Sequence, residues 1–95
     1  MKICIFFISG SHFTSKISNN LKWIRALEKR EFIVKTAKIA DYEILYEECL
    51  NFIEDCQKRY ISPCIGIIGL SSGGYFALKI KNNISQLNFC ITIAP

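Results

Sequence analysis

The sequence predicts an α/β fold, a three-layer sandwich with a short parallel four-strand sheet and the element order β-α-β-α-β-α-β. Short apolar runs alternate along the chain with longer stretches in which apolar residues recur every three or four positions. This alternation is typical of strands separated by helices. The runs are apolar almost throughout, which indicates strands covered on both faces. We therefore expect right-handed crossovers and helices on both sides of the sheet.

The first half of the chain contains two expected strands with a helix between them. The run KICIFFIS at 2–9 reads as a buried strand, and GSHFTS follows as a loop. FIVKTAKI at 32–39 reads as a less buried strand, because Lys35 and Lys38 interrupt it. The helix between the two strands is indicated by apolar residues at helical spacing, namely Ile17, Leu21, Ile24 and Leu27.

The second half repeats the alternation. Asp41 is the expected N-cap of a helix, which Pro63 ends by its missing N–H. CIGIIGL at 64–70 is the third strand and LNFCITI at 87–93 the fourth. The helix between these strands is expected at 73–83, with Asn82 or Asn83 as a left-handed C-cap. The apolar side of the earlier helix is formed by Leu45, Cys49, Phe52, Cys56 and Tyr60.

Length and composition define the class of protein. The chain has 95 residues, 51% of them hydrophobic and 21% charged, which indicates a single packed domain over 1–95. The net charge of +4 is dispersed, and without a basic stripe we expect no nucleic-acid partner.

The longest apolar runs fall well short of the about 20 residues of a membrane span, so we expect no membrane partner. The apolar run of MKICIFFISGS is also shorter than the about 7–15 residues usual in a signal peptide.

The five cysteines and single histidine indicate no metal site. No cysteine pair has C-x-x-C spacing, and one histidine makes no zinc signature. Reduced, buried cysteines are typical of proteins in a reducing compartment. We therefore expect a cytoplasmic protein with no metal and no cofactor.

One short motif carries the strongest chemical signal. Gly69, Ser71 and Gly73 satisfy G-x-S-x-G, with an apolar strand before the motif and a helix after it. A nucleophile on such a tight strand-to-helix turn has a strained backbone, and only small neighbours fit beside it. The alternative is a plain helix start in which Ser71 or Ser72 is the N-cap. An elbow serine that no longer reacts is a further possibility.

The element order together with this motif resembles the central part of the α/β-hydrolase family. The resemblance covers the whole chain but only about the middle of a usual family member, so it implies a partial α/β-hydrolase core. It implies that Ser71 is the serine nucleophile and that the N–H of Ser72 is one oxyanion donor. It places the second donor in the loop after the first strand, at Gly10 or Ser11.

The chain departs from the family in its triad. The family's acid and histidine lie in later segments, whereas the single histidine here is His12, on the loop after the first strand. A serine hydroxyl is a weak nucleophile without a base, and His12 is a candidate base only if the two loops meet. We expect a hydrolase-like protein or fragment, acting on esters, thioesters or amides, that is not active by itself. The alternative is a non-catalytic binding or interaction module.

Other ligand-binding motifs are incomplete. GSHFTSK lacks the second glycine of a phosphate-binding loop, and GIIGLSSGG does not fit G-x-G-x-x-G. Backbone amides at the start of the 73–83 helix still allow a bound anion without catalysis. Tyr75, just inside that helix, is expected to line a pocket beside Ser71.

The last strand is expected to be an edge. By analogy with the family, the strands lie in the order second, first, third, fourth. The final strand is apolar, and an apolar edge favours pairing with another chain. We expect a homo-oligomer or a complementing chain at residues 88–93, and a small acyl substrate if the protein is active.

Overall fold

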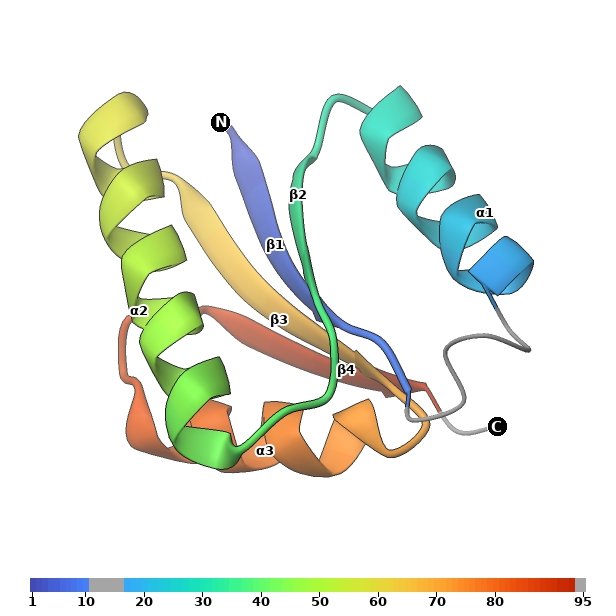
Figure 1. Ribbon diagram of the computed structural model, residues 1–95. Helices are drawn as coiled ribbons and strands as arrows, with labels where there is room; N and C mark the ends of the chain where they lie inside the picture. The colour runs from blue at the N-terminus through green and yellow to red at the C-terminus, as the bar shows by residue number, and fades with distance from the viewer. Residues whose placement is uncertain (11–16, 94–95) are drawn as a thin grey trace.

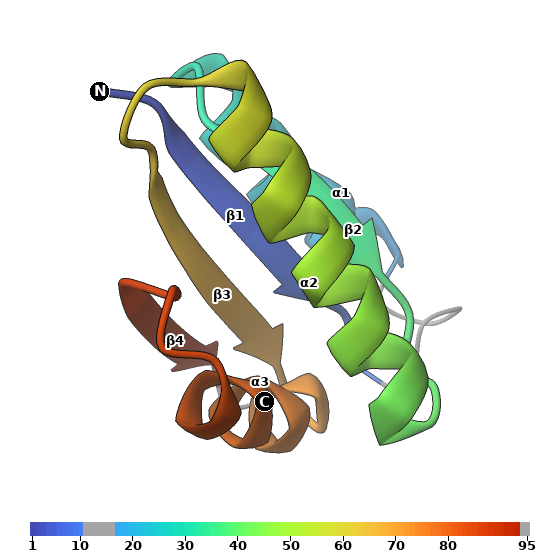
Figure 2. The same cartoon turned by 90° about the vertical axis from the view of Figure 1, so that its left-hand side faces the viewer.

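The computed structural model describes residues 1–10 and 17–93. These residues form one sheet of four parallel strands in the order β2-β1-β3-β4, which confirms the predicted α/β fold and strand order. Figure 2 shows β3 between β1 and β4. The strands are β1 (Ile3–Ile8), β2 (Ile33–Ala37), β3 (Cys64–Leu70) and β4 (Phe89–Ile93).

Three helices complete the expected three layers. They are α1 (Ile17–Lys29), α2 (Tyr42–Arg59) and α3 (Gly73–Asn83). Figure 1 shows α2 and α3 on one side of the sheet and α1 on the other. None of the helices in the described ranges is long and apolar enough to cross a membrane.

Alternation along β1 divides the core between the two faces of the sheet. Successive strand residues point to opposite faces, so Cys4 and Phe6 face α2 and α3 while Ile5 and Phe7 face the side of α1. All four side chains are buried. This two-sided burial explains why the strand is apolar at every position rather than at every second one.

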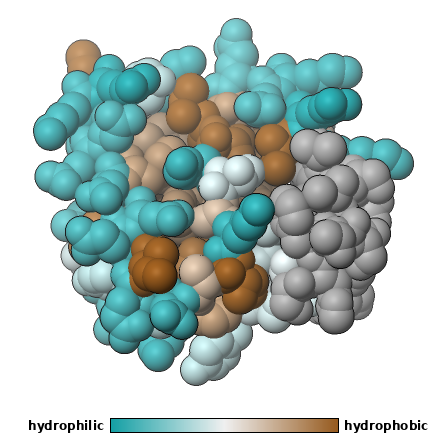
Figure 3. Space-filling model, in the orientation of Figure 1, coloured by the Kyte–Doolittle hydropathy of each residue, from teal (hydrophilic) through white to brown (hydrophobic). Residues whose placement is uncertain are grey.

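The helix α2 is amphipathic and closes one face of the sheet. Leu45, Cys49, Ile53 and Cys56 are buried at helical spacing, and Figure 3 shows hydrophilic side chains over α2 at the left of the view. Asp41 occupies the predicted N-cap position, but its side chain makes no capping hydrogen bond. Its backbone carbonyl oxygen instead accepts the N–H of Leu45 at 3.1 Å.

The expected left-handed cap at the end of α3 is wrong. Asn82 and Asn83 are both helical, and the helix ends at Ile84 with an extended backbone at φ −127°. The side-chain amide of Asn83 donates instead to the hydroxyl of Tyr42 at 3.0 Å and to the carbonyl of Lys79 at 2.9 Å. Asn83 therefore links α3 to the start of α2 rather than reversing the chain.

Candidate active site

Ser71 lies in a strained turn between β3 and α3. Its φ is 57°, which places a non-glycine residue in the left-handed region. This conformation is uncommon for residues with a Cβ and costs about 1–3 kcal/mol. The turn is tight, since only Ser71 and Ser72 separate Leu70, at the end of β3, from Gly73. The strained turn expected from the sequence is therefore present.

Close packing on both sides of Ser71 requires small residues. A Cβ at Gly69 would overlap the carbonyl of Gly73, and a Cβ at Gly73 would lie 2.5 Å from the carbonyl oxygen of Ile8. Both obstacles are backbone atoms, which do not move aside as a flexible side chain does. The motif's glycines thus allow the start of α3 to pack against the ends of β1 and β3.

Two backbone hydrogen bonds fix the conformation of Ser71. Its N–H donates to the carbonyl oxygen of Ile93 at 2.7 Å, and its carbonyl oxygen accepts the N–H of Gly74 at 2.9 Å. The role of Ile93 is not visible in the local sequence. It follows from the parallel register of β3 and β4, which brings Leu70 beside Ile93. The elbow is therefore held by the edge strand as well as by its own helix.

The loop after β1 meets the Ser71 turn. A Cβ on Gly10 would lie 3.1 Å from Ser71 Cβ and 3.7 Å from Ser71 Oγ. Figure 1 shows β1 and β3 ending at the same end of the sheet. The preceding residue, Ser9, is anchored to β2, because its N–H and its hydroxyl both donate to the carbonyl of Ala37, at 3.0 and 3.2 Å. The crevice between β1 and β3, where the strand order reverses, is the usual ligand position in parallel sheets.

The candidate oxyanion donors are only partly described. Gly10 lies beside the Ser71 side chain, and Ser72 follows directly in the turn. The N–H of Ser9 is already bonded to Ala37. The other donor candidate, Ser11, and the candidate base, His12, lie outside the described residues. The oxyanion roles of Gly10, Ser11 and Ser72, and the role of His12 as a base, stay predictions.

The backbone does not fit a plain helix start at Ser71. Ser72, not Ser71, occupies the N-cap position of α3, and its side chain makes no capping hydrogen bond. Its φ of −61° and ψ of −23° are already helical, whereas a typical N-cap has β-region angles. Side-chain capping therefore gives no reason for the positive φ at Ser71.

The described residues that hold Ser71 carry no acid or base. Its contacts with Gly10, Gly74 and Ile93 involve groups that do not titrate. No cluster of His, Cys, Asp or Glu in residues 1–10 and 17–93 is placed to bind a metal ion. A base for Ser71 is thus not among these contacts.

The buried thiols are poor alternatives as nucleophiles. Burial raises the pKa of Cys49 from 9.0 to about 12. Burial, together with a hydrogen bond to the Cys4 thiol, raises the pKa of Cys56 to about 12 as well. Because the thiolate is the reactive form, these protonated cysteines belong to the core.

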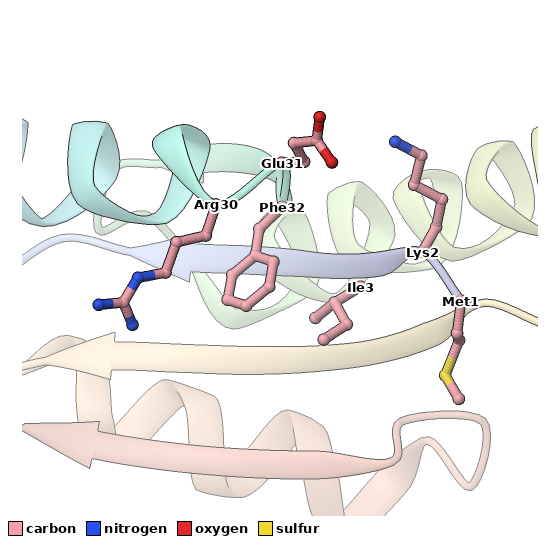
Figure 4. Close-up of a pocket in the computed structure, with 6 residues that line it drawn as sticks. All are labelled: Met1, Lys2, Ile3, Arg30, Glu31 and Phe32. Carbon is pink, nitrogen blue, oxygen red and sulfur yellow. The ribbon is translucent and has the colours of Figure 1, made fainter.

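Two pockets are lined entirely by residues in the described ranges, and neither has Ser71 in its lining. One, of about 290 Å³, lies at the amino ends of β1 and β2, whereas ligands of parallel sheets bind at the carboxyl ends. Figure 4 shows the charged ends of Lys2 and Arg30 pointing away from each other, so they do not converge on one anion. The lining residues are Met1, Lys2, Ile3, Arg30, Glu31 and Phe32.

A second, open hollow of about 500 Å³ lies where α2 meets α3. It is lined by Tyr42, Glu43, Tyr46, Glu47 and Asn83. Lys79 places its ammonium group 4.3 Å from the centroid of the Tyr42 ring. The residues lining this hollow do not include Tyr75, which is 67% exposed, so the expected role of Tyr75 beside Ser71 stays a prediction.

Comparisons with protein-family models, with curated proteins and with solved structures found no match to this chain.

Proposed function

We propose that the chain is an α/β-hydrolase-like unit in which Ser71 occupies the position of the acyl-accepting nucleophile. The observation that carries the proposal is the positive φ of Ser71, 57°, on a turn from a parallel strand into a helix. Strained backbone persists only where the surroundings impose it, and such strain clusters at functional sites. The proposed substrates are esters, thioesters or amides with a small acyl group.

The geometry favours acyl transfer over other serine chemistry. Ser71 is half-buried at the crevice between β1 and β3, and the backbone of Gly10 lies beside its side chain. In the proposed reaction Ser71 Oγ attacks the acyl carbon as its proton passes to a base, and N–H groups of the two adjoining loops stabilise the oxyanion. The oxyanion collapses to an acyl-enzyme as the bond to the alcohol, thiol or amine breaks, and this leaving group takes the proton from the base. Water then hydrolyses the acyl-enzyme. Gly10 suits the role of an oxyanion donor, because a Cβ at this position would lie 3.1 Å from Ser71 Cβ.

A base is required for turnover. Serine must lose its proton to attack, and the described contacts of Ser71 supply no acceptor. The proposal therefore assigns the base to His12 or to a segment other than the described residues. Without a base, an oxyanion hole and binding alone retain only about 10³–10⁴-fold acceleration over water.

The second candidate is a non-catalytic hydrolase-like module that binds a partner or a small ligand. The observation that favours it is the lack of a titrating group among the described contacts of Ser71. In this case the turn persists as part of the scaffold.

Labelling with a fluorophosphonate probe distinguishes the two candidates. The hydrolase proposal with His12 as the base predicts an adduct on Ser71 in the wild-type chain and none in Ser71→Ala, with the site mapped by mass spectrometry. Ser72→Ala is the matched control, because Ser72 is the adjacent and more exposed serine of the same turn. Equal labelling of wild type and Ser71→Ala, or a folded chain that takes up no probe, would contradict the hydrolase proposal. The second of these results would favour the binding module.

A further inference from the structure

The two edges of the sheet differ in their protection against pairing. At one edge, β2 carries the exposed Lys35, and the exposed Lys38 follows the strand. Charged side chains, especially lysine, are a common means of protecting an edge strand. At the other edge, residues 84–93 contain no charged side chain and no proline. The side chains of β4 itself therefore give no such protection, although Lys81 of α3 lies near enough to act electrostatically on Cys90.

Apolar side chains accompany the open backbone edge of β4. Ile91 is 48% exposed, and Phe89 and Ile93, which point to the same face, are half-buried. On the other face, Gly74 of α3 lies against Thr92, and the 52% exposed Leu78 follows one helical turn later. Within residues 1–10 and 17–93, no strand pairs with the outer edge of β4, so this edge combines strand hydrogen-bonding groups that can accept another strand with apolar surface on both sides.

We propose that β4 pairs with β4 of a second copy of the chain, antiparallel about a two-fold axis at Ile91. The two four-stranded sheets would then form one continuous sheet. Unpaired N–H and C=O groups along a strand are satisfied by another extended strand. In this register Ile91 faces Ile91 of the partner subunit, and Phe89 faces Ile93 of the partner subunit.

The composition of β4 favours its own copy as the occupant. A two-fold interface places each group opposite a group of the same patch, so a charged strand would repel itself. The strand FCITI is neutral, and its apolar residues meet apolar residues in the proposed register. Cross-strand aromatic and β-branched pairs of this kind stabilise antiparallel strands.

The protected β2 edge limits the size of the assembly. A sheet with two open edges could add further copies at both ends without limit, whereas this sheet has one open edge, that of β4. Pairing through β4 alone uses up the open edges of both copies. We therefore expect a closed dimer and not a growing ribbon.

The mass in solution tests the proposal directly. By light scattering and sedimentation equilibrium, the wild-type chain should have twice the 10.9 kDa of one copy. Ile91→Lys should weaken association by about 100-fold or more, because two lysines would face each other across the axis. Thr36→Lys makes a similar change at an exposed position of β2 and should leave the dimer intact. Circular dichroism checks that both variants are folded.

Cross-linking tests the register. In Ile91→Cys the two introduced thiols lie at the axis, so a short bis-maleimide should join them, whereas Thr36→Cys should give no such product. Peptide mapping separates these links from those of the native cysteines. A wild-type chain that stays monomeric at high concentration would overturn the proposal. This holds even if the monomer binds an added apolar peptide. A dimer that Ile91→Lys leaves intact would also overturn it.

Discussion

The two faces of the sheet differ in how completely helices cover them. The face under α2 and α3 buries a large cluster that includes Phe6, Ile67 and Ile80. On the face of α1, Ile5, Phe7 and Ile68 are also buried, but Phe89 and Ile93 of β4 are only half-buried. Among the described elements, two helices cover the first face and one covers the second (Figure 1), so we infer that the second face leaves apolar surface for association at the β4 edge.

The largest expected effect comes from the adjacent pair Phe6 and Phe7. Both are fully buried on β1 but point to opposite faces, and Phe6 also packs against the ring of Phe52 at 6.0 Å. Truncation of a buried phenylalanine costs about 3–5 kcal/mol, depending on how far the site can collapse. We expect the cost of Phe6→Ala to lie near the upper end of this range and that of Phe7→Ala near the lower end. The reason is that the face of α1, which one helix covers, relaxes more easily than the face of α2 and α3.

Urea denaturation measures the free energy of unfolding of Phe6→Ala and Phe7→Ala. The two variants and the wild type are compared at one protein concentration, because association contributes to the stability of a dimer. Equal losses of unfolding free energy in the two variants would show that the faces do not differ in rigidity.

The next effect is an alkaline loss of stability specific to the face of α2. The pKa of Cys49 and that of Cys56 are each about 12 in the folded chain, above the ordinary 9.0. The unfolded state therefore loses these protons first, so stability is intact below pH 9 and falls as pH rises towards 12. Each thiol adds a slope of about 1.4 kcal/mol per pH unit in that range.

A variant isolates this contribution from lysine and tyrosine titration. Cys49→Ala should be less stable than the wild type at neutral pH. Above pH 9 its free energy of unfolding should fall less steeply with pH, because the contribution of one thiol, about 1.4 kcal/mol per pH unit, is removed. Urea denaturation at several pH values measures the difference. Identical slopes in the two proteins would mean that Cys49 is not held protonated by burial.

The smallest effect concerns the face of α1, where Phe89 lies over Gly66. A Cβ on Gly66 would overlap the ring of Phe89, so Gly66→Ala should cost about 1–2 kcal/mol through overpacking. In a Phe89→Ala background the same change should cost about 1 kcal/mol less. A double-mutant cycle in urea gives the coupling. Additive changes would indicate that the ring of Phe89 moves aside freely.

Local signals in the sequence were sufficient for the fold and for the turn. Apolar runs and helical spacing predicted the order of strands and helices along the chain, and the glycines on either side of Ser71 predicted its strained backbone. These features depend on residues close together in the chain, whereas the order of the strands across the sheet was predicted by analogy with the α/β-hydrolase family. The bounds were less accurate, since β2 covers 33–37 rather than 32–39, because backbone hydrogen bonding to β1, and not composition, decides where the strand ends.

Features that depend on tertiary contacts were not predictable from the sequence. The bond from Ser71 to Ile93 joins segments more than twenty positions apart, and the place of Phe89 over Gly66 depends on the register of β3 and β4. Asn83 fits a C-cap by residue type, but its contact with Tyr42 holds it in the helix. The catalytic assignment of Ser71 remains a prediction, because a base cannot be placed from the described contacts.

The hydrogen bond between Ser71 and Ile93 makes the elbow and the edge strand a coupled system. Whatever orders β4 also narrows the range of conformations open to Ser71, because Ile93 supplies the acceptor for its N–H. Thermodynamic linkage is reciprocal, so an acyl ligand that holds Ser71 would strengthen the pairing of β4 by the same free energy. Probe uptake at Ser71 and the fraction of dimer would then rise together with protein concentration.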